Sequence, residues 1–227
     1  MKNICIIPAR AGSKRLHGKN SKLLGGIPLI AHSILYAQEN NTIIDTVYVS
    51  TDDEQIKKIA LEYGVHVIDR PASLSGDNEP TVSALKHVLE SLEGEIENVI
   101  LLQPTNPLRP KNLLQEAFEI YQKEDRDSLF TVSRCHQKLG RIVNNQFIPF
   151  NYEIGQRSQD LELLYSENGL LYITKSKAIL ENEIITKRAF PLEVNHIFAS
   201  IDIDTQEDFD YAQYVLGREN FDRISTL

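Results

Sequence analysis

Four basic side chains crowd the loop that follows the first apolar run of this chain. The run covers residues 3–9, NICIIPA, and the loop contains Arg10, Lys14, Arg15 and Lys19. No acidic residue occurs among the first 38 positions, although the chain of 227 residues carries a formal net charge of -8. Basic side chains and free backbone N–H groups at a strand end bind phosphates. The loop therefore predicts a site for a small polyphosphate or a similar anion.

The loop is not a P-loop of the Walker type. That motif has four residues between its first glycine and Gly-Lys, followed by a Ser or Thr that contacts the metal. Here five residues separate Gly12 from Gly18, and Asn20 follows Lys19. We interpret the loop as a set of cations that hold phosphates from several directions, with an ordinary solvated basic loop as the alternative.

A second group of polar residues lies near the other end of the chain, where Asp202 and Asp204 alternate with two isoleucines. If residues 196–204 form a strand, the two carboxylates share one face and the isoleucines face the core. Mg²⁺ typically takes one or two carboxylates and completes its coordination with water and phosphate oxygens. The pair therefore suits a metal bound together with a nucleotide, unless Asp204 merely caps the following helix.

Two further strand ends carry polar side chains. Gln103 follows the apolar run 98–102, and its amide can hydrogen-bond the edge of a nucleobase. Arg70 follows residues 66–69 and can hold a phosphate or act as an ordinary ion-pair partner. Asp52 and Asp53 follow the run 46–51; because adjacent strand residues face opposite sides, they make a weaker pair, and Asp53 is expected to cap a helix.

Apolar runs alternate with helical patterns along most of the chain. The predicted strands are residues 3–9, 46–51, 66–69, 98–105, 128–133, 168–174 and 196–204. Apolar residues at helical spacing begin near positions 29, 56, 82, 113 and 205. This alternation predicts an α/β fold with a mainly parallel sheet, in which ligands bind beyond the carboxyl ends of the strands.

Residues 135–165 interrupt the alternation. They are polar and include the tract Asn144-Asn145-Gln146, so we expect an irregular or β-hairpin insertion in a single domain spanning residues 1–227. Such an insertion can act as a lid over the site or as a dimerisation surface. A loop without function is the alternative.

Composition narrows the class of protein. With 41% hydrophobic and 25% charged residues, the chain can bury one sizeable core. Its acidity argues against nucleic acid or an anionic membrane as a partner, and no apolar stretch reaches the 18 residues of a membrane span. We expect a cytoplasmic protein, in which Cys5 and Cys135 are buried free thiols.

Four motifs in order together resemble those of the acylneuraminate cytidylyltransferases, the CMP-sialic acid synthetases. They are IIPARAGSKRLHGKN from Ile6, Arg70-Pro71, LLQPTNPLR from Leu101 and SIDIDT from Ser200. Cytidylyltransferases for legionaminic, pseudaminic and Kdo acids share parts of this set. The resemblance implies a Rossmann-like three-layer nucleotidyltransferase fold, a homodimer, Mg²⁺ (or Mn²⁺) as cofactor, and CTP and an acidic nine-carbon sugar as substrates.

The resemblance also assigns roles to individual residues. It places the nucleotide at Arg10, Ser13, Lys19, Asn20, Arg70 and Thr81. It places the sugar acid at Gln103, Arg157 and Asn168, although Arg157 stands one position away from the family arginine. It identifies Asp202 and Asp204 as the metal ligands, and it makes these two residues, with Arg10 and Lys19, the catalytic set.

We therefore predict an enzyme that joins CMP from CTP to a nonulosonic, sialic-acid-like sugar acid and releases pyrophosphate. A Kdo cytidylyltransferase, a metal-dependent nucleotide-sugar glycosyltransferase and a non-catalytic nucleotide-binding sensor are the alternatives. Ser166-Glu167 stands where several bacterial relatives have Arg-Pro, so the identity of the sugar acid stays open.

Overall fold

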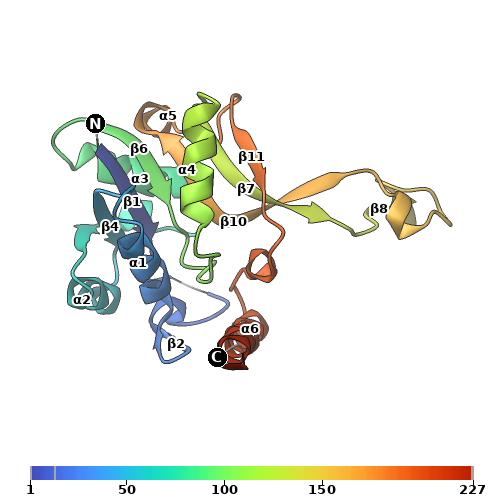
Figure 1. Cartoon of the computed structure of the whole chain (residues 1–227), viewed down its shortest axis with the longest axis horizontal. Coiled ribbons are helices and arrows are strands. Elements are labelled where there is room, and N and C mark those ends of the chain that lie inside the picture. Colours follow the sequence, from blue (N-terminus) through green and yellow to red (C-terminus); the bar gives the residue numbers. More distant parts are fainter. Residues whose placement is uncertain (1, 13, 226–227) are drawn as a thin grey trace.

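A seven-stranded sheet forms the centre of the molecule in the computed structural model, which describes residues 2–12 and 14–225 (Figure 1). In spatial order its strands are β11 (Phe190–Glu193), β7 (Ser128–Cys135), β10 (Leu164–Lys175), β6 (Ile96–Leu101), β1 (Lys2–Pro8), β4 (Thr46–Thr51) and β5 (His66–Asp69). Neighbouring strands are parallel except where β10 pairs with β6 and β7. The predicted mainly parallel α/β sheet is confirmed.

Helices cover both faces of this sheet. Side chains alternate along β1, so Cys5 and Ile7 face one side and Ile4 and Ile6 the other, all fully buried. The first side packs against α1 (Leu29–Glu39), α2 (Glu54–Glu62) and α4 (Leu113–Lys123). The second packs against α3 (Thr81–Glu90) and α5 (Ser176–Leu180). The result is the predicted three-layer Rossmann-like arrangement.

The strand order reverses next to β1. From β1 the chain proceeds outward through β4 and β5, and then crosses back to β6 on the other side of β1. In open α/β sheets, ligands bind in the crevice outside the carboxyl ends of the strands at such a switch point. The loops after β1 and β6 both open there, and they carry the basic loop and Gln103.

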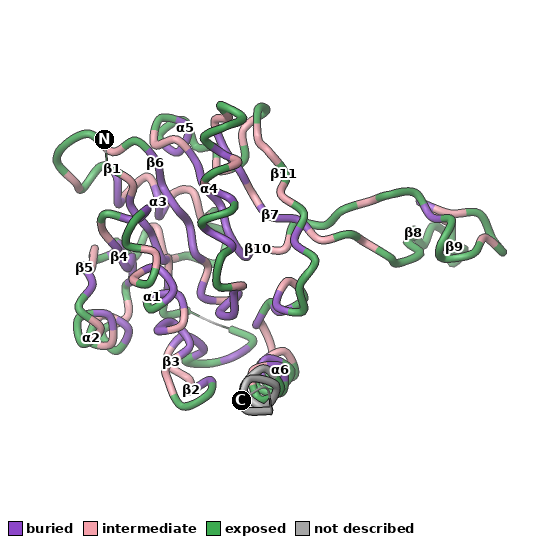
Figure 2. The backbone as a smooth tube through the Cα atoms, viewed as in Figure 1, coloured by how far each residue is buried: buried purple, intermediate pink, exposed green. Residues whose placement is uncertain are grey.

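A long arm leaves the body between β7 and β10 (Figure 1). It carries a small hairpin of β8 (Gly140–Val143) and β9 (Gln146–Pro149), and most of its residues are exposed (Figure 2). Cys5 is buried as expected, but Cys135 is only partly buried, which corrects the expectation for that thiol. The reason is its place at the end of β7, where the strand leaves the core.

The expected strand at residues 196–204 is wrong. Instead a 3₁₀ turn spans Ile197–Ser200, an extended segment follows, and α6 covers Gln206–Ser225. Ile201 and Ile203 are buried in a separate apolar cluster with residues of α6, rather than paired in the sheet. Two strands of two residues each, β2 (Leu23–Leu24) and β3 (Ile27–Pro28), form an antiparallel hairpin near this cluster.

Within residues 2–12 and 14–225, no helix combines the length and the apolar character needed to cross a membrane.

Candidate functional site

A basic cavity of about 440 Å³ lies at the carboxyl ends of β1 and β6. Its lining includes the cations Arg10, Lys14, Arg15, Lys19 and Arg70. The same cavity is lined by four other predicted site residues, Asn20, Thr81, Gln103 and Asp204. Residues far apart in the sequence therefore meet here as predicted, whereas Ser13 lies outside the described residues.

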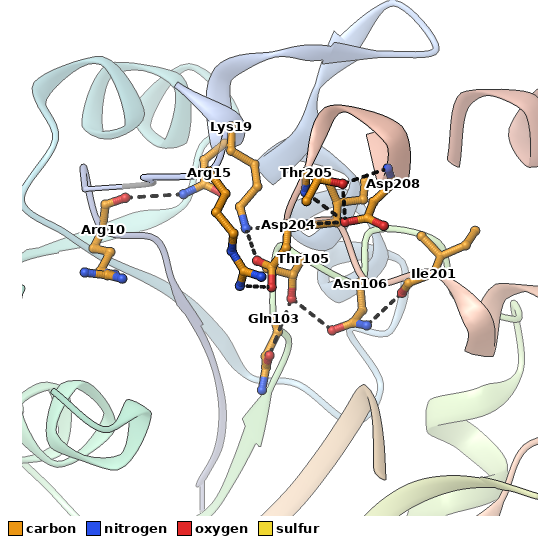
Figure 3. Close-up of polar contacts among 12 residues, drawn as sticks. Arg10, Arg15, Lys19, Gln103, Thr105, Asn106, Ile201, Asp204, Thr205 and Asp208 are labelled. Atoms are coloured by element: carbon orange, nitrogen blue, oxygen red, sulfur yellow. Dashed lines mark hydrogen bonds and ion pairs between the residues drawn. The ribbon is translucent and has the colours of Figure 1, made fainter. Parts of the chain in front are cut away.

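Two cations of the first loop converge on Asp204, whereas Arg10 lies apart from them (Figure 3). Lys19 begins a short 3₁₀ turn (Lys19–Ser21) and is buried; its Nζ donates to the Ile203 carbonyl at 2.7 Å and to Asp204 Oδ1 at 3.0 Å. Arg15 Nη2 donates to Asp204 Oδ2 at 2.6 Å. The basic loop is thus joined to the acidic pair across more than 180 residues of sequence.

The segment that carries Asp202 is held by the loop after β6 rather than by a strand. Ile203 N donates to the Thr105 carbonyl at 2.8 Å, and the buried Asn106 Nδ2 donates to the Ile201 carbonyl at 2.8 Å (Figure 3). These bonds keep the segment extended, so the alternation of buried isoleucines and accessible carboxylates persists without a sheet.

Electrostatics within the acidic pair disfavour two free charges. Burial raises the pKa of Asp202, and the negative charge of Asp204 raises it further, while a hydrogen bond from Thr105 and the charge of Lys19 oppose the shift. A cation between the two carboxylates would relieve this repulsion.

Helix capping does not account for Asp204. At the start of α6, Thr205 N donates to Asp208 Oδ2 at 2.8 Å, and Asp208 N donates to Thr205 Oγ1 at 3.2 Å, which is a reciprocal capping box. The Asp204 carboxylate is therefore available for other partners. Asp53 caps α2 as predicted, because its Oδ1 accepts from the first backbone N–H groups of that helix.

The donor set fits a hard divalent cation bound with phosphate. Among the described residues there is no group of three or more potential His, Cys, Asp or Glu ligands. A pair of carboxylates is nevertheless what Mg²⁺ uses when substrate phosphates and water complete its shell. Asp202 and Asp204 would hold it, and it would compete with Arg15 for Asp204.

The cations farther from Asp204 meet a carboxylate that sequence inspection did not single out. Arg10 Nη1 donates to Asp77 Oδ1 at 2.7 Å, and Lys14 forms an ion pair with the other oxygen of Asp77. The hydrogen bonds from Lys14 and Arg10 lower the pKa of Asp77. Asp77 thus forms ion pairs with cations that are predicted to bind phosphate.

Arg70 and Thr81 form the wall of the basic cavity on the β4 and α3 side. Arg70 is buried; its Nε donates to Ser50 Oγ at 3.1 Å and its Nη2 to the Ser50 carbonyl at 2.7 Å. Burial lowers its pKa, opposed by the nearby charge of Asp52. Arg70 forms no ion pair with a described residue, so the interpretation as an ordinary ion-pair partner finds no support. Thr81 is the first residue of α3.

A second cavity of about 300 Å³ adjoins the first, and Gln103 lines both. Asn168 and Asp202 lie in its wall. Asn168 is oriented by Thr131 Oγ1, which donates to its Oδ1 at 2.6 Å. Arg157 instead lies on the arm, 71% exposed and paired with Asp160 at 2.7 Å. The structure therefore brings Gln103 and Asn168 together without Arg157.

Sequence reasoning missed Arg109, although it ends the LLQPTNPLR motif. Its buried guanidinium donates to the Gln103 carbonyl at 2.9 Å, the Leu170 carbonyl at 2.7 Å and Ser33 Oγ at 3.0 Å. Burial lowers its pKa to about 10. Arg109 thus holds the backbone carbonyl of Gln103 in place. The signal in the sequence was an arginine at the end of a polar motif that follows a predicted strand.

An open α/β sheet with a basic cavity at its switch point is the architecture of a nucleotide-binding protein. The sequence profile of the cytidylyltransferase family matches residues 4–224. The chain belongs to this cytidylyltransferase family, and the resemblance seen in its motifs is confirmed.

Individual relatives agree with this assignment. The chain is 37% identical to the pseudaminic acid cytidylyltransferase of Campylobacter jejuni subsp. jejuni serotype O:23/36, covering 94% of this chain and 95% of that protein. It is 36% identical to the CMP-N,N'-diacetyllegionaminic acid synthase of Legionella pneumophila subsp. pneumophila, covering 92% and 94%. It is also 36% identical to the N-acylneuraminate cytidylyltransferase of Streptococcus agalactiae serotype V, covering 98% of this chain but 54% of that protein.

The chain thus spans about half the length of its N-acylneuraminate cytidylyltransferase relatives from Streptococcus agalactiae. Among solved structures, a CMP:2-keto-3-deoxy-manno-octonic acid synthetase complexed with CTP superposes with a TM-score of 0.72 and 18% identity. The superposition covers 96% of this chain and 100% of that chain. At this identity it supports the fold.

Proposed function

We propose that the chain is a cytidylyltransferase that joins CMP from CTP to a nonulosonic sugar acid and releases pyrophosphate. The observation that carries the proposal is the pairing of a basic cavity and a polar cavity that share Gln103, with Asp202 and Asp204 in their walls. A triphosphate fits the first and a sugar acid the second, so the reacting atoms would meet beside the two carboxylates. The names of the relatives support this pair of substrates.

The basic side chains hold the nucleotide in this proposal. Arg10 and Lys19 neutralise charge on the triphosphate, and Asn20 adds an amide donor. Arg70 and Thr81 bind the cytidine half from the opposite wall, and Gln103 and Asn168 bind the sugar acid. Fixed cations that face developing negative charge stabilise a transition state strongly, because they need no reorganisation during the reaction.

The reaction is a displacement at the α-phosphate. The anomeric hydroxyl oxygen forms a bond to the α-phosphorus, the bond from that phosphorus to the bridging oxygen breaks, and pyrophosphate leaves with the electron pair. The hydroxyl proton passes to solvent water as the new bond forms. Asp202 and Asp204 would hold Mg²⁺, which would supply Lewis acidity against the negative charge that develops in the reaction.

The decisive experiment mixes the protein with CTP, Mg²⁺ and one of five acids, N-acetylneuraminic, legionaminic, pseudaminic, Kdn or Kdo acid, and measures pyrophosphate release. We expect release with at least one nine-carbon acid, together with a CMP-sugar product. Pyrophosphate release with Kdo alone would show that the substrate is an eight-carbon acid. Sugar transfer from a CMP- or UDP-sugar without pyrophosphate would indicate a glycosyltransferase, and CTP binding without turnover would indicate a sensor.

We also propose that residues 1–227 form a single nucleotidyltransferase domain and that the arm joins two copies of the chain in a homodimer. The arm exposes Ile142 (78%), Phe150 (61%) and Ile154 (84%), which is unusual for apolar side chains in water. Sedimentation of the parent should give a dimer, and Ile142→Glu with Ile154→Glu should give a monomer. Leu61→Glu, at an exposed leucine of α2, is the matched control. A monomeric parent at micromolar concentration would contradict the proposal.

We further propose that the protein works in the cytoplasm. Its two cysteines are free thiols, one of them partly exposed, which suits a reducing compartment.

A further inference from the structure

The second cavity lacks the positive charge that an acidic substrate would be expected to need. The described residues that line it include two carboxylates, Glu167 and Asp202, and no Lys, Arg or His. A negative group on the substrate is repelled by this wall and attracted by the basic cavity beyond Gln103. An acid sugar bound here therefore directs its own carboxylate away from Glu167.

Glu167 is held in a defined position although it is solvent-accessible. The hydroxyl of the buried Tyr172 donates a hydrogen bond to Glu167 Oε1. Tyr172 keeps its proton, because burial raises its pKa and the adjacent Glu167 raises it further. Among the described residues no hydrogen-bond donor contacts Glu167 Oε2, and Glu167 lines the second cavity, so this oxygen can accept a hydrogen bond from a ligand.

The backbone around Glu167 is also specialised. The register of β10 against β7 shifts between Glu167 and Tyr172, and Gly169 has a left-handed φ of 74° within this irregularity. A Cβ at Gly169 would lie 2.5 Å from Asn106 Oδ1. The bulge therefore depends on a glycine packed against the loop after β6, and it turns Glu167 and Asn168 into the cavity wall.

We infer that Glu167 is a specificity-determining residue that accepts a hydrogen bond from an N–H or O–H group of the sugar acid. This inference rests on the proposed function and narrows its substrate class to acids with an amide or hydroxyl donor on the side opposite the carboxylate. A carboxylate is a stronger acceptor than a neutral oxygen. A site built to bind such a donor rejects analogues that lack it, because its own polar group then stays unpaired.

The test compares Glu167→Gln, Tyr172→Phe and the control Glu162→Gln, an exposed carboxylate that lines neither cavity. Pyrophosphate release gives kcat/KM for the preferred acid and for its deoxy and deacetamido analogues, and KM for CTP. For Glu167→Gln we expect kcat/KM for the preferred acid to fall roughly tenfold or more. The fall should disappear for the analogue that lacks the recognised donor. Tyr172→Phe should show a smaller fall with the same analogue dependence.

Several readouts distinguish recognition from damage to the fold. For Glu167→Gln, the KM for CTP should stay within twofold of the parent value. Its melting temperature should stay within a few degrees of the parent. If Glu167→Gln keeps kcat/KM within twofold for every acid, or weakens all acids equally, the inference is overturned while the proposed function stands. If the parent releases no pyrophosphate with any acid, both are overturned.

Discussion

Replacing Lys19 by methionine separates its role in catalysis from its role in the fold. Its side chain is only 9% exposed, and its Nζ bridges the Ile203 carbonyl and Asp204 Oδ1 at 2.7 and 3.0 Å. Methionine is one atom shorter than lysine; it keeps an unbranched apolar stem but lacks the charge. The substitution therefore leaves the packing and removes the cation that links the basic loop to the acidic pair.

The contacts set the expected magnitudes. Losing one preorganised donor to a developing charge costs about 3 kcal/mol at the transition state, so kcat/KM for CTP should fall on the order of a hundredfold. Leaving the Ile203 carbonyl without its donor costs about 1–3 kcal/mol of folding free energy. For a chain of this size that lowers the melting temperature by roughly 2–12 °C. Because globular domains typically unfold with a free energy of about 5–15 kcal/mol, we expect the variant to stay folded at 25 °C, so that unfolding does not account for the loss of rate.

Pyrophosphate release at 25 °C and thermal unfolding measure the two effects on the same sample. Lys22→Met is the matched control, since Lys22 lies in the same loop and lines neither cavity. Its Nζ contacts Gln206 Oε1 at 3.5 Å and lies 5.8 Å from the centre of the Phe209 ring, both in α6. We expect the control to stay within twofold of the parent. A folded Lys19→Met variant with kcat/KM within threefold of the parent would refute the catalytic role of Lys19.

Three other substitutions follow from the contacts of the site. Asp77→Asn frees Arg10 from its internal carboxylate, so the KM for CTP should fall by up to about fivefold; an increase would show that Asp77 aids binding instead. Asn106→Asp replaces the amide donor to the Ile201 carbonyl by a carboxylate oxygen, so kcat should fall about tenfold or more while calorimetry still detects CTP; unchanged kcat would contradict the clamp. In metal-free protein, burial and a neighbouring carboxylate raise the pKa of Asp202 above its ordinary value of 3.8. The folded state therefore loses stability as the pH rises from 3.8 through the higher pKa of the folded protein. Asp202→Asn should therefore melt higher than the parent at pH 7, with the gap closing at acid pH; equal gaps at both pH values would contradict this reasoning.

Most of the sheet and its helices could be predicted because periodicity is a local property of the chain. The apolar runs at residues 3–9, 46–51 and 66–69 coincide with β1, β4 and β5 to within one residue, and the helical patterns that begin near positions 29 and 56 fall on α1 and α2. The alternation of apolar and polar residues wrongly predicted a strand at residues 196–204. An extended segment packed on a helix buries alternate side chains just as a strand does, and only pairing with neighbouring strands distinguishes the two.

The sequence by itself determined the basic loop at the end of the first strand, the α/β class and the alternation that keeps both Asp202 and Asp204 accessible. The tertiary structure alone decided which partner each polar group meets. Asn106 bonds residues 62 and 95 positions away, Asp77 reaches Arg10 from 67 positions away, and the arm carries Arg157 away from the second cavity. Backbone periodicity arises from neighbouring residues, whereas hydrogen bonds and charge pairs depend on segments that only the folded chain brings together.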